Sequence, residues 1–181
     1  MKTDMTLRLS RRAILLSGAA AGVTAMLPGG AALAQTAGGT AVMTITPEPN
    51  AMVSAFNSAS PVAVISGKMV EGLVRYDWDL QPQPELATGW EIAPDGLTFT
   101  FTLREGVKWH DGQPFTSADV AYSIMELLKQ HHPRGRAVFA PVERAETPDD
   151  HTVILHLSKP APAIMAALAG WESPILPKHV Y

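Results

Sequence analysis

The chain has 181 residues, with 14 basic against 17 acidic side chains, a net charge of −3 and no cysteine. This charge balance removes the electrostatic basis for a nucleic-acid partner. The hydrophobic fraction of 46% excludes a wholly disordered chain. The absence of cysteine excludes disulfides, thiolate metal sites, a cysteine nucleophile and an N-terminal lipid-modified cysteine.

Residues 1–34 have the three parts of a cleaved export signal. A basic start is followed by an apolar run over residues 13–27 and by Ala-Leu-Ala at residues 32–34, an A-x-A pattern that predicts cleavage after Ala34. The apolar run is too short for a spanning helix, which needs about 20 residues, so an uncleaved anchor is the weaker alternative. Removal of the leader leaves 10 basic and 16 acidic residues, a net charge of −6.

The paired Arg11 and Arg12 lie just before the apolar run, within the stretch Ser10–Leu15. Paired arginines at this place are typical of a twin-arginine export signal. We therefore expect the twin-arginine machinery as a partner during export. The expected product is periplasmic, with no lipid anchor.

The first elements of the mature chain are a strand and a helix. The apolar run Ala41–Ile45, stopped by prolines, predicts a buried strand followed by a loop. Apolar spacing over Pro61–Leu73 predicts a helix with one buried face that ends near Gly72. A proline-rich loop is expected over Leu80–Pro84.

The clearest local pattern lies between Gly89 and Leu103. Large apolar residues alternate with threonines from Leu97 to Leu103, which is typical of a half-buried antiparallel strand. The turn residues 93–96 contain Asp-Gly and connect this strand to an earlier one, so a hairpin is predicted. The aromatic residues of the pattern are interpreted as core rather than as a stacking platform.

Further signals alternate between helix and strand. A turn is expected at residues 110–112, and Thr116 followed by Asp119 predicts the start of a helix that stops by His132. The last elements expected are a strand over Thr152–Leu157 after a turn at 148–150, and a helix over Ala163–Ala169 closed by Gly170. Strands and helices without a repeated βαβ rhythm indicate an α+β arrangement in this part of the chain.

Several of these blocks together resemble one protein family. They are Pro84–Glu91, Pro94–Phe101, Leu103–Gly112 and Pro114–Val120, with weaker likeness at Asp149–Val153 and Ile175–His179. The resemblance is to the family 5 extracellular solute-binding proteins, the peptide, oligopeptide and nickel receptors of ABC importers, and it covers roughly residues 41–181.

The resemblance implies a two-lobed α/β fold of the type II periplasmic-binding-protein kind, of which only the N-terminal portion is expected here. By analogy, residues 35–65 begin the first lobe and residues 66–181 form its N-terminal subdomain. Family members are several times longer, so the chain is expected to be a fragment.

The resemblance also implies a function. The parent would capture a peptide-like solute by lobe closure, without covalent chemistry or cofactor, and deliver it to a membrane permease and its ATPase. A nickel-chelate receptor and an adaptor-like fragment without ligand binding are the alternatives. An exported hydrolase is disfavoured because the sequence has neither a G-x-S-x-G nor an H-E-x-x-H motif.

Candidate ligand contacts come from irregular segments that would border the cleft. Thr46, Glu48 and Asn57 lie after the first predicted strand. By loose alignment with the family, Phe139, Trp171 and Glu172 lie near ligand, with Trp171 as a flat wall and Glu172 as a partner for an amino terminus. No metal site is predicted, because the adjacent His131 and His132 at a helix end point in different directions.

Overall fold

The structure, a computed structural model, describes residues 42–181. The expected export signal, with its cleavage after Ala34, lies outside these residues. Met43–Tyr181 form one structural unit. No helix within residues 42–181 is both long enough and apolar enough to cross a membrane.

A four-stranded antiparallel sheet forms the main layer of this unit. Its strands are, in spatial order, β3 (Ala87–Ile92), β4 (Thr98–Leu103), β6 (Thr152–Leu157) and β5 (Val142–Asp149). The predicted hairpin is confirmed as β3–β4, with Gly96 in the turn at a φ of 70° that favours glycine. The predicted strand Thr152–Leu157 is confirmed as β6.

One face of the sheet carries the core. Phe99 is 2% exposed and Phe101 is fully buried, and across the ladder they oppose Leu155 and Val153, which are also buried. The threonines between them on β4 are more exposed. Phe99 and Phe101 therefore serve as core, as interpreted from their alternation, and Trp90 is partly buried and packs against that core.

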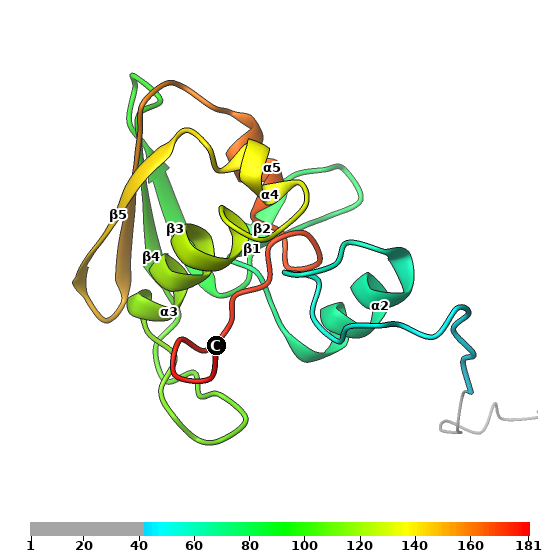
Figure 1. Cartoon of the computed structure of the whole chain (residues 1–181). Coiled ribbons are helices and arrows are strands. Elements are labelled where there is room, and N and C mark those ends of the chain that lie inside the picture. The colour runs from blue at the N-terminus through cyan, green and yellow to red at the C-terminus, as the bar shows by residue number, and fades with distance from the viewer. Residues whose placement is uncertain (1–41) are drawn as a thin grey trace, which may run out of the picture. The chain divides into compact units, whose positions relative to one another are not determined.

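A helix lies against the core face of the sheet, where it contacts β5 and β6 (Figure 1). It begins as α3 (Ser117–Tyr122) and continues as a π-helical turn, η1 (Ser123–Leu128). The predicted helix start is confirmed, and the Thr116 N–H donates to Asp119 Oδ2 at 2.9 Å. The π-helical turn was not predicted; in it the Lys129 N–H donates to the Ile124 carbonyl.

The segment before the sheet differs from its prediction in two places. Helix α2 (Ser60–Met69) ends earlier than the expected Gly72, and the chain continues as β1 (Val74–Tyr76). The expected loop over Leu80–Pro84 contains a strand, β2 (Pro82–Pro84), paired antiparallel with β1. Proline is tolerated there because β2 has a single partner strand and needs few ladder donors.

The expected buried strand over Ala41–Ile45 is wrong for the residues that the structure describes. Residues 42–45 are irregular, and Val42 and Met43 are 89% and 72% exposed. A strand needs a neighbour to pair its backbone donors and acceptors. Within residues 42–181 no strand pairs with this segment.

Two short helices complete the unit. The first is α4 (Gly135–Val138), which, like strand β5, the sequence patterns do not predict. The final helix, α5 (Ala163–Ala167), confirms the predicted helix but ends two residues before Ala169. Helices α4 and α5 contact each other, which brings the residues that flank them together (Figure 1).

Candidate functional site

The turn after α5 is fixed to the start of β1 by backbone contact. A Cβ added to Gly72 would lie 2.3 Å from the Gly170 nitrogen, so only glycine fits at this crossing. The N–H groups of Leu73 and Val74 donate to the Leu168 carbonyl at 3.1 and 3.3 Å. The residues that follow Gly170 are therefore held in a defined position at the surface.

Arg134 and Glu172 form an ion pair between the turn before α4 and the turn after α5. The Arg134 Nη2 lies 2.6 Å from the Glu172 Oε1, and the two side chains are 56% and 16% exposed. Burial raises the pKa of the Glu172 carboxyl, and the nearby Arg134 guanidinium opposes that rise. The acid is thus the less exposed partner and the guanidinium the more accessible one.

Trp171 completes this cluster. Its side chain is 55% exposed, and the Arg134 Cζ lies 5.9 Å from the centroid of its ring. This distance permits a cation–π interaction. We call Arg134, Trp171 and Glu172 the arginine cluster.

A pocket of about 280 Å³ opens beside Trp171. Its wall includes Arg75, Tyr76 and Glu85, which lie on and after β1 and β2. The Glu85 Oε2 accepts the Gly72 N–H at 3.2 Å, and burial raises the pKa of this carboxyl. The pocket therefore combines aromatic surface with one cationic and one acidic group.

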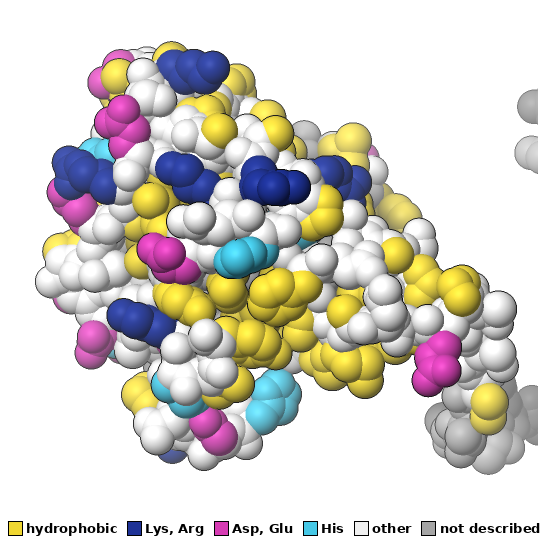
Figure 2. All heavy atoms as spheres, viewed as in Figure 1, with side chains coloured by type: hydrophobic (Ala, Val, Ile, Leu, Met, Phe, Trp, Pro, Cys, Tyr) yellow, Lys and Arg dark blue, Asp and Glu magenta, His cyan; other side chains and the backbone are white. Residues whose placement is uncertain are grey.

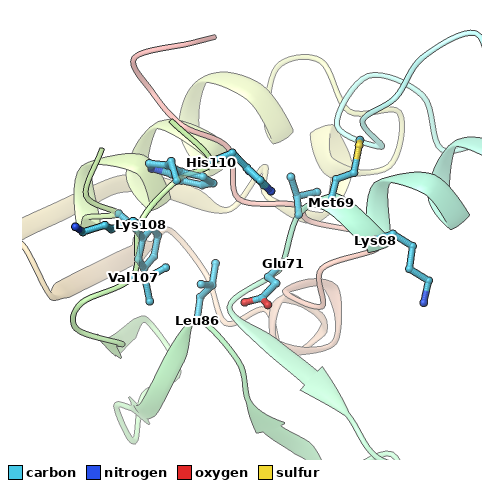
Figure 3. Close-up of a pocket in the computed structure, with 11 residues that line it drawn as sticks. Lys68, Met69, Glu71, Leu86, Val107, Lys108 and His110 are labelled. Carbon is cyan, nitrogen blue, oxygen red and sulfur yellow. The ribbon is translucent and has the colours of Figure 1, made fainter. Parts of the chain in front are cut away.

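A second pocket of about 340 Å³ lies between the end of α2 and the turn around His110. In Figure 3 the Glu71 carboxylate approaches Leu86, while Lys68 and Lys108 point away from the centre. Its lining mixes apolar side chains, such as Leu86 and Val107, with the charged residues Lys68, Glu71 and Lys108. Within residues 42–181 no group of three or more His, Cys, Asp or Glu residues could hold a metal ion.

A third hollow is the most apolar. Figure 2 shows hydrophobic side chains gathered between α2 and the C-terminal residues. They surround a hollow of about 350 Å³ lined by Val53, Met69, Val70, Trp109, Leu176, Pro177, Val180 and Tyr181, among others.

The structure brings two of the six expected site residues, Trp171 and Glu172, into one cluster. Phe139 is 1% exposed and belongs to the core. Thr46 and Glu48 are exposed in the irregular segment, and the Asn57 side chain bonds to Asn50 at 2.6 Å and to the Ala59 N–H at 2.8 Å.

Arg134 was missed as a site residue. Its partner Glu172 lies far along the sequence, on a different turn, so no local pattern marks the pair. The closest local sign is the sequence Pro-Arg-Gly-Arg, which indicates only a loop.

Comparison with known families decides the class of the protein. The profile of the bacterial extracellular solute-binding proteins, family 5 (middle region), matches residues 81–180. This chain belongs to that family. The resemblance inferred from the hairpin and helix-start motifs is thereby confirmed, and the family is one of solute-binding receptors rather than enzymes.

Two relatives of this family 5 chain are named for peptide transport. A protein of Brucella ovis, named as an ABC-transporter peptide-binding protein, is 39% identical over 113 residues, which are 60% of this chain and 20% of the relative. A protein of Sinorhizobium fredii, named as a periplasmic-binding protein of a peptide ABC transporter, is 30% identical over 93% of this chain and 32% of the relative. The chain therefore spans between a fifth and a third of their length.

Solved structures confirm the fold. AgaA of A. tumefaciens R10, in complex with agropinic acid, is 36% identical with a TM-score of 0.64, over 74% of this chain and 27% of that one. NikZ of Campylobacter jejuni, in complex with Ni(L-His), is 32% identical with the same TM-score, 0.64, over 74% and 27% of the two chains. DppA of Helicobacter pylori, in complex with the peptide STSA, is 26% identical with a TM-score of 0.62, over 74% and 30%. The family 5 chain is a mixed α/β part of this two-lobed periplasmic-binding-protein fold.

Proposed function

We propose that this family 5 chain is part of a receptor that captures a peptide-like solute and delivers it to an ABC importer. The observation that carries the proposal is the family match over residues 81–180, joined to relatives named for peptide transport. Capture is non-covalent and needs no cofactor. The partners are the permease and ATPase subunits of the importer.

The geometry beside Trp171 supports a peptide-like solute. Trp171 offers a flat aromatic surface, and the adjoining pocket carries Arg75 and Glu85. A peptide has two charged ends and an amide backbone, so it can use both signs of charge and an aromatic wall. Trp171 and Glu172 are the proposed site residues for this region. Thr46, Glu48 and Asn57 stay proposals for ligand contact, whereas Phe139 is packed in the core.

A nickel chelate is the less favoured solute, although NikZ of Campylobacter jejuni was solved in complex with Ni(L-His). Within residues 42–181 no cluster of His, Cys, Asp or Glu is suited to a metal ion. An adaptor without ligand binding is the other alternative, and a binding experiment separates it from the receptor.

Export and organisation belong to the same proposal. The receptor works in the periplasm after twin-arginine export and cleavage behind Ala34. Arg11, Arg12 and the A-x-A pattern at residues 32–34 support this route. Residues 35–65 would begin the first lobe and residues 66–181 would form its subdomain. The route of export is supported by the sequence pattern alone.

The test is calorimetric titration of the complete gene product with pools of di- to pentapeptides, with mass spectrometry of the peptides before and after. A receptor binds saturably and returns the peptides intact, whereas a hydrolase shortens them. Trp171→Ala should weaken binding, and Trp78→Ala is the matched control because Trp78 is fully exposed on the turn between β1 and β2. Absence of binding to every pool would contradict the proposal and favour the adaptor.

A further inference from the structure

Glu172 is already matched by a positive charge. Its Oε1 lies 2.6 Å from the Arg134 Nη2, and its side chain is only 16% exposed. An ammonium group that approached from solvent would meet the guanidinium first, because Arg134 is 56% exposed. Because like charges repel, the exposed guanidinium disfavours binding of a cationic end of a solute at this cluster.

Arg134 keeps most of its hydrogen-bonding capacity. A guanidinium has five N–H donors in a planar fork, and it suits carboxylates in a bidentate arrangement. Within residues 42–181, the ion pair to Glu172 is the one polar contact that this side chain makes. The remaining donors are available at the surface.

The guanidinium is also held in place. Glu172 anchors one nitrogen, the Trp171 ring lies 5.9 Å from the Cζ, and the turn that carries both is fixed through Gly72 and Gly170. An arginine that is positioned before binding loses less side-chain entropy when a ligand arrives.

We propose that Arg134 is a specificity-determining contact that binds a carboxylate of the solute, while Glu172 and Trp171 act as positioning residues. The inference rests on the proposed function and names the chemistry of one end of its solute. For a peptide, that group is the terminal carboxylate or an acidic side chain.

The experiment compares two pools of di- to pentapeptides lacking Asp and Glu, one with free and one with amidated C-termini, against the complete gene product. The variants are Arg134→Gln, Arg134→Lys and the double variant Arg134→Gln/Glu172→Gln, which does not leave the partly buried Glu172 carboxylate without its partner. Arg144→Gln is the matched control, because Arg144 is also paired with a glutamate and is 55% exposed, but lies on β5. Thermal unfolding of each variant reports whether it folds.

We expect the wild type and Arg144→Gln to bind the free pool roughly 10- to 100-fold more tightly than the amidated pool, the range expected for a charge-assisted hydrogen bond. Both Gln variants at Arg134 should lose this preference, and Arg134→Lys should keep part of it. A pool preference that persists in a folded double variant overturns the inference but leaves the receptor proposal intact. Equal binding of both pools by the wild type also overturns the inference about Arg134 and leaves the receptor proposal intact. If the wild type binds neither pool, both the inference and the receptor proposal are overturned.

Discussion

The His132 Nδ1 accepts the Gly135 N–H at 2.8 Å, in a site where His132 is only 2% exposed. This bond joins the end of the helix that covers the sheet to the start of α4, next to Arg134. It requires a neutral imidazole, because both ring nitrogens become donors when the ring is protonated. Burial lowers the pKa of His132, and the charge of Arg134 lowers it further.

A pH-dependent stability follows from this bond. Because the pKa of His132 is lower in the folded than in the unfolded protein, the unfolded protein binds more protons at acidic pH. The contribution of neutral His132 to the free energy of unfolding is complete above the pKa of the unfolded state, about 6.5. It is lost as the pH falls below that value, and the free energy of unfolding then changes by at most about 1.4 kcal/mol per pH unit. Urea unfolding at several pH values between 5 and 8 measures this slope.

The variant His132→Asn should flatten the pH dependence, because an amide oxygen can accept the Gly135 N–H without titrating in this range. His131→Gln, at the exposed neighbouring position, is the control. The raised pKa values of Glu85 and Glu172 affect the pH dependence of stability equally in both variants. If His132→Asn kept the full wild-type slope, the titration would belong to another group.

The close backbone contact at Gly72 leads to a prediction about the stability of a variant with a larger side chain. In Gly72→Ala the new Cβ would clash with Gly170, at 2.3 Å from its nitrogen, so β1 and the turn with Trp171 must separate. We expect a loss of about 1–3 kcal/mol in the free energy of unfolding, as for other overpacked sites, together with weaker solute binding. Gly67→Ala is the control: it meets nothing within 4 Å and lies in α2, where it should gain about 0.5–1 kcal/mol. Equal stability of the two variants would contradict the contact.

Local patterns account for the parts of the fold that the sequence predicts well. The β3–β4 hairpin has its alternating strand and its turn within one short stretch, and the helix start at Thr116 carries its own cap. By contrast, the run Ala41–Ile45 is apolar whether or not a neighbouring strand covers it. Strand β5 is largely exposed and paired only with β6, so it shows no alternation.

The candidate site is less predictable because it depends on contacts between segments that are far apart in the sequence. Trp171 and Glu172 were proposed from a family likeness, but the partner of Glu172 is set by the contact between α4 and α5. Such a contact depends on how two helices pack, which no spacing within either segment records. Phe139, taken for a loop residue, packs in the core because α4 returns the chain to the sheet.

The paired arginines of the leader predict the export route. Changing Arg11 and Arg12 together to lysine keeps the charge of the leader but removes the feature that the twin-arginine machinery reads. We expect the precursor to accumulate in the cytoplasm, as measured by cell fractionation with immunoblotting. Arg8→Lys is the control and should be exported normally. Normal export of the double lysine variant would indicate the general secretory route instead.

Asp119 ties three segments together through one buried carboxylate, 5% exposed. Its Oδ2 accepts the Thr116 N–H at 2.9 Å and the Trp109 indole N–H at 3.1 Å, and its Oδ1 accepts the Lys178 N–H at 2.9 Å. Asp119→Ala leaves these donors without their acceptor, so we expect a loss of about 2–4 kcal/mol in the free energy of unfolding. Asp95→Ala removes a single bond, to the Leu97 N–H on an exposed turn, and should cost about 1 kcal/mol or less. Urea unfolding of both variants checks the difference; similar losses would mean that solvent replaces the Asp119 bonds and that the three segments hold together without them.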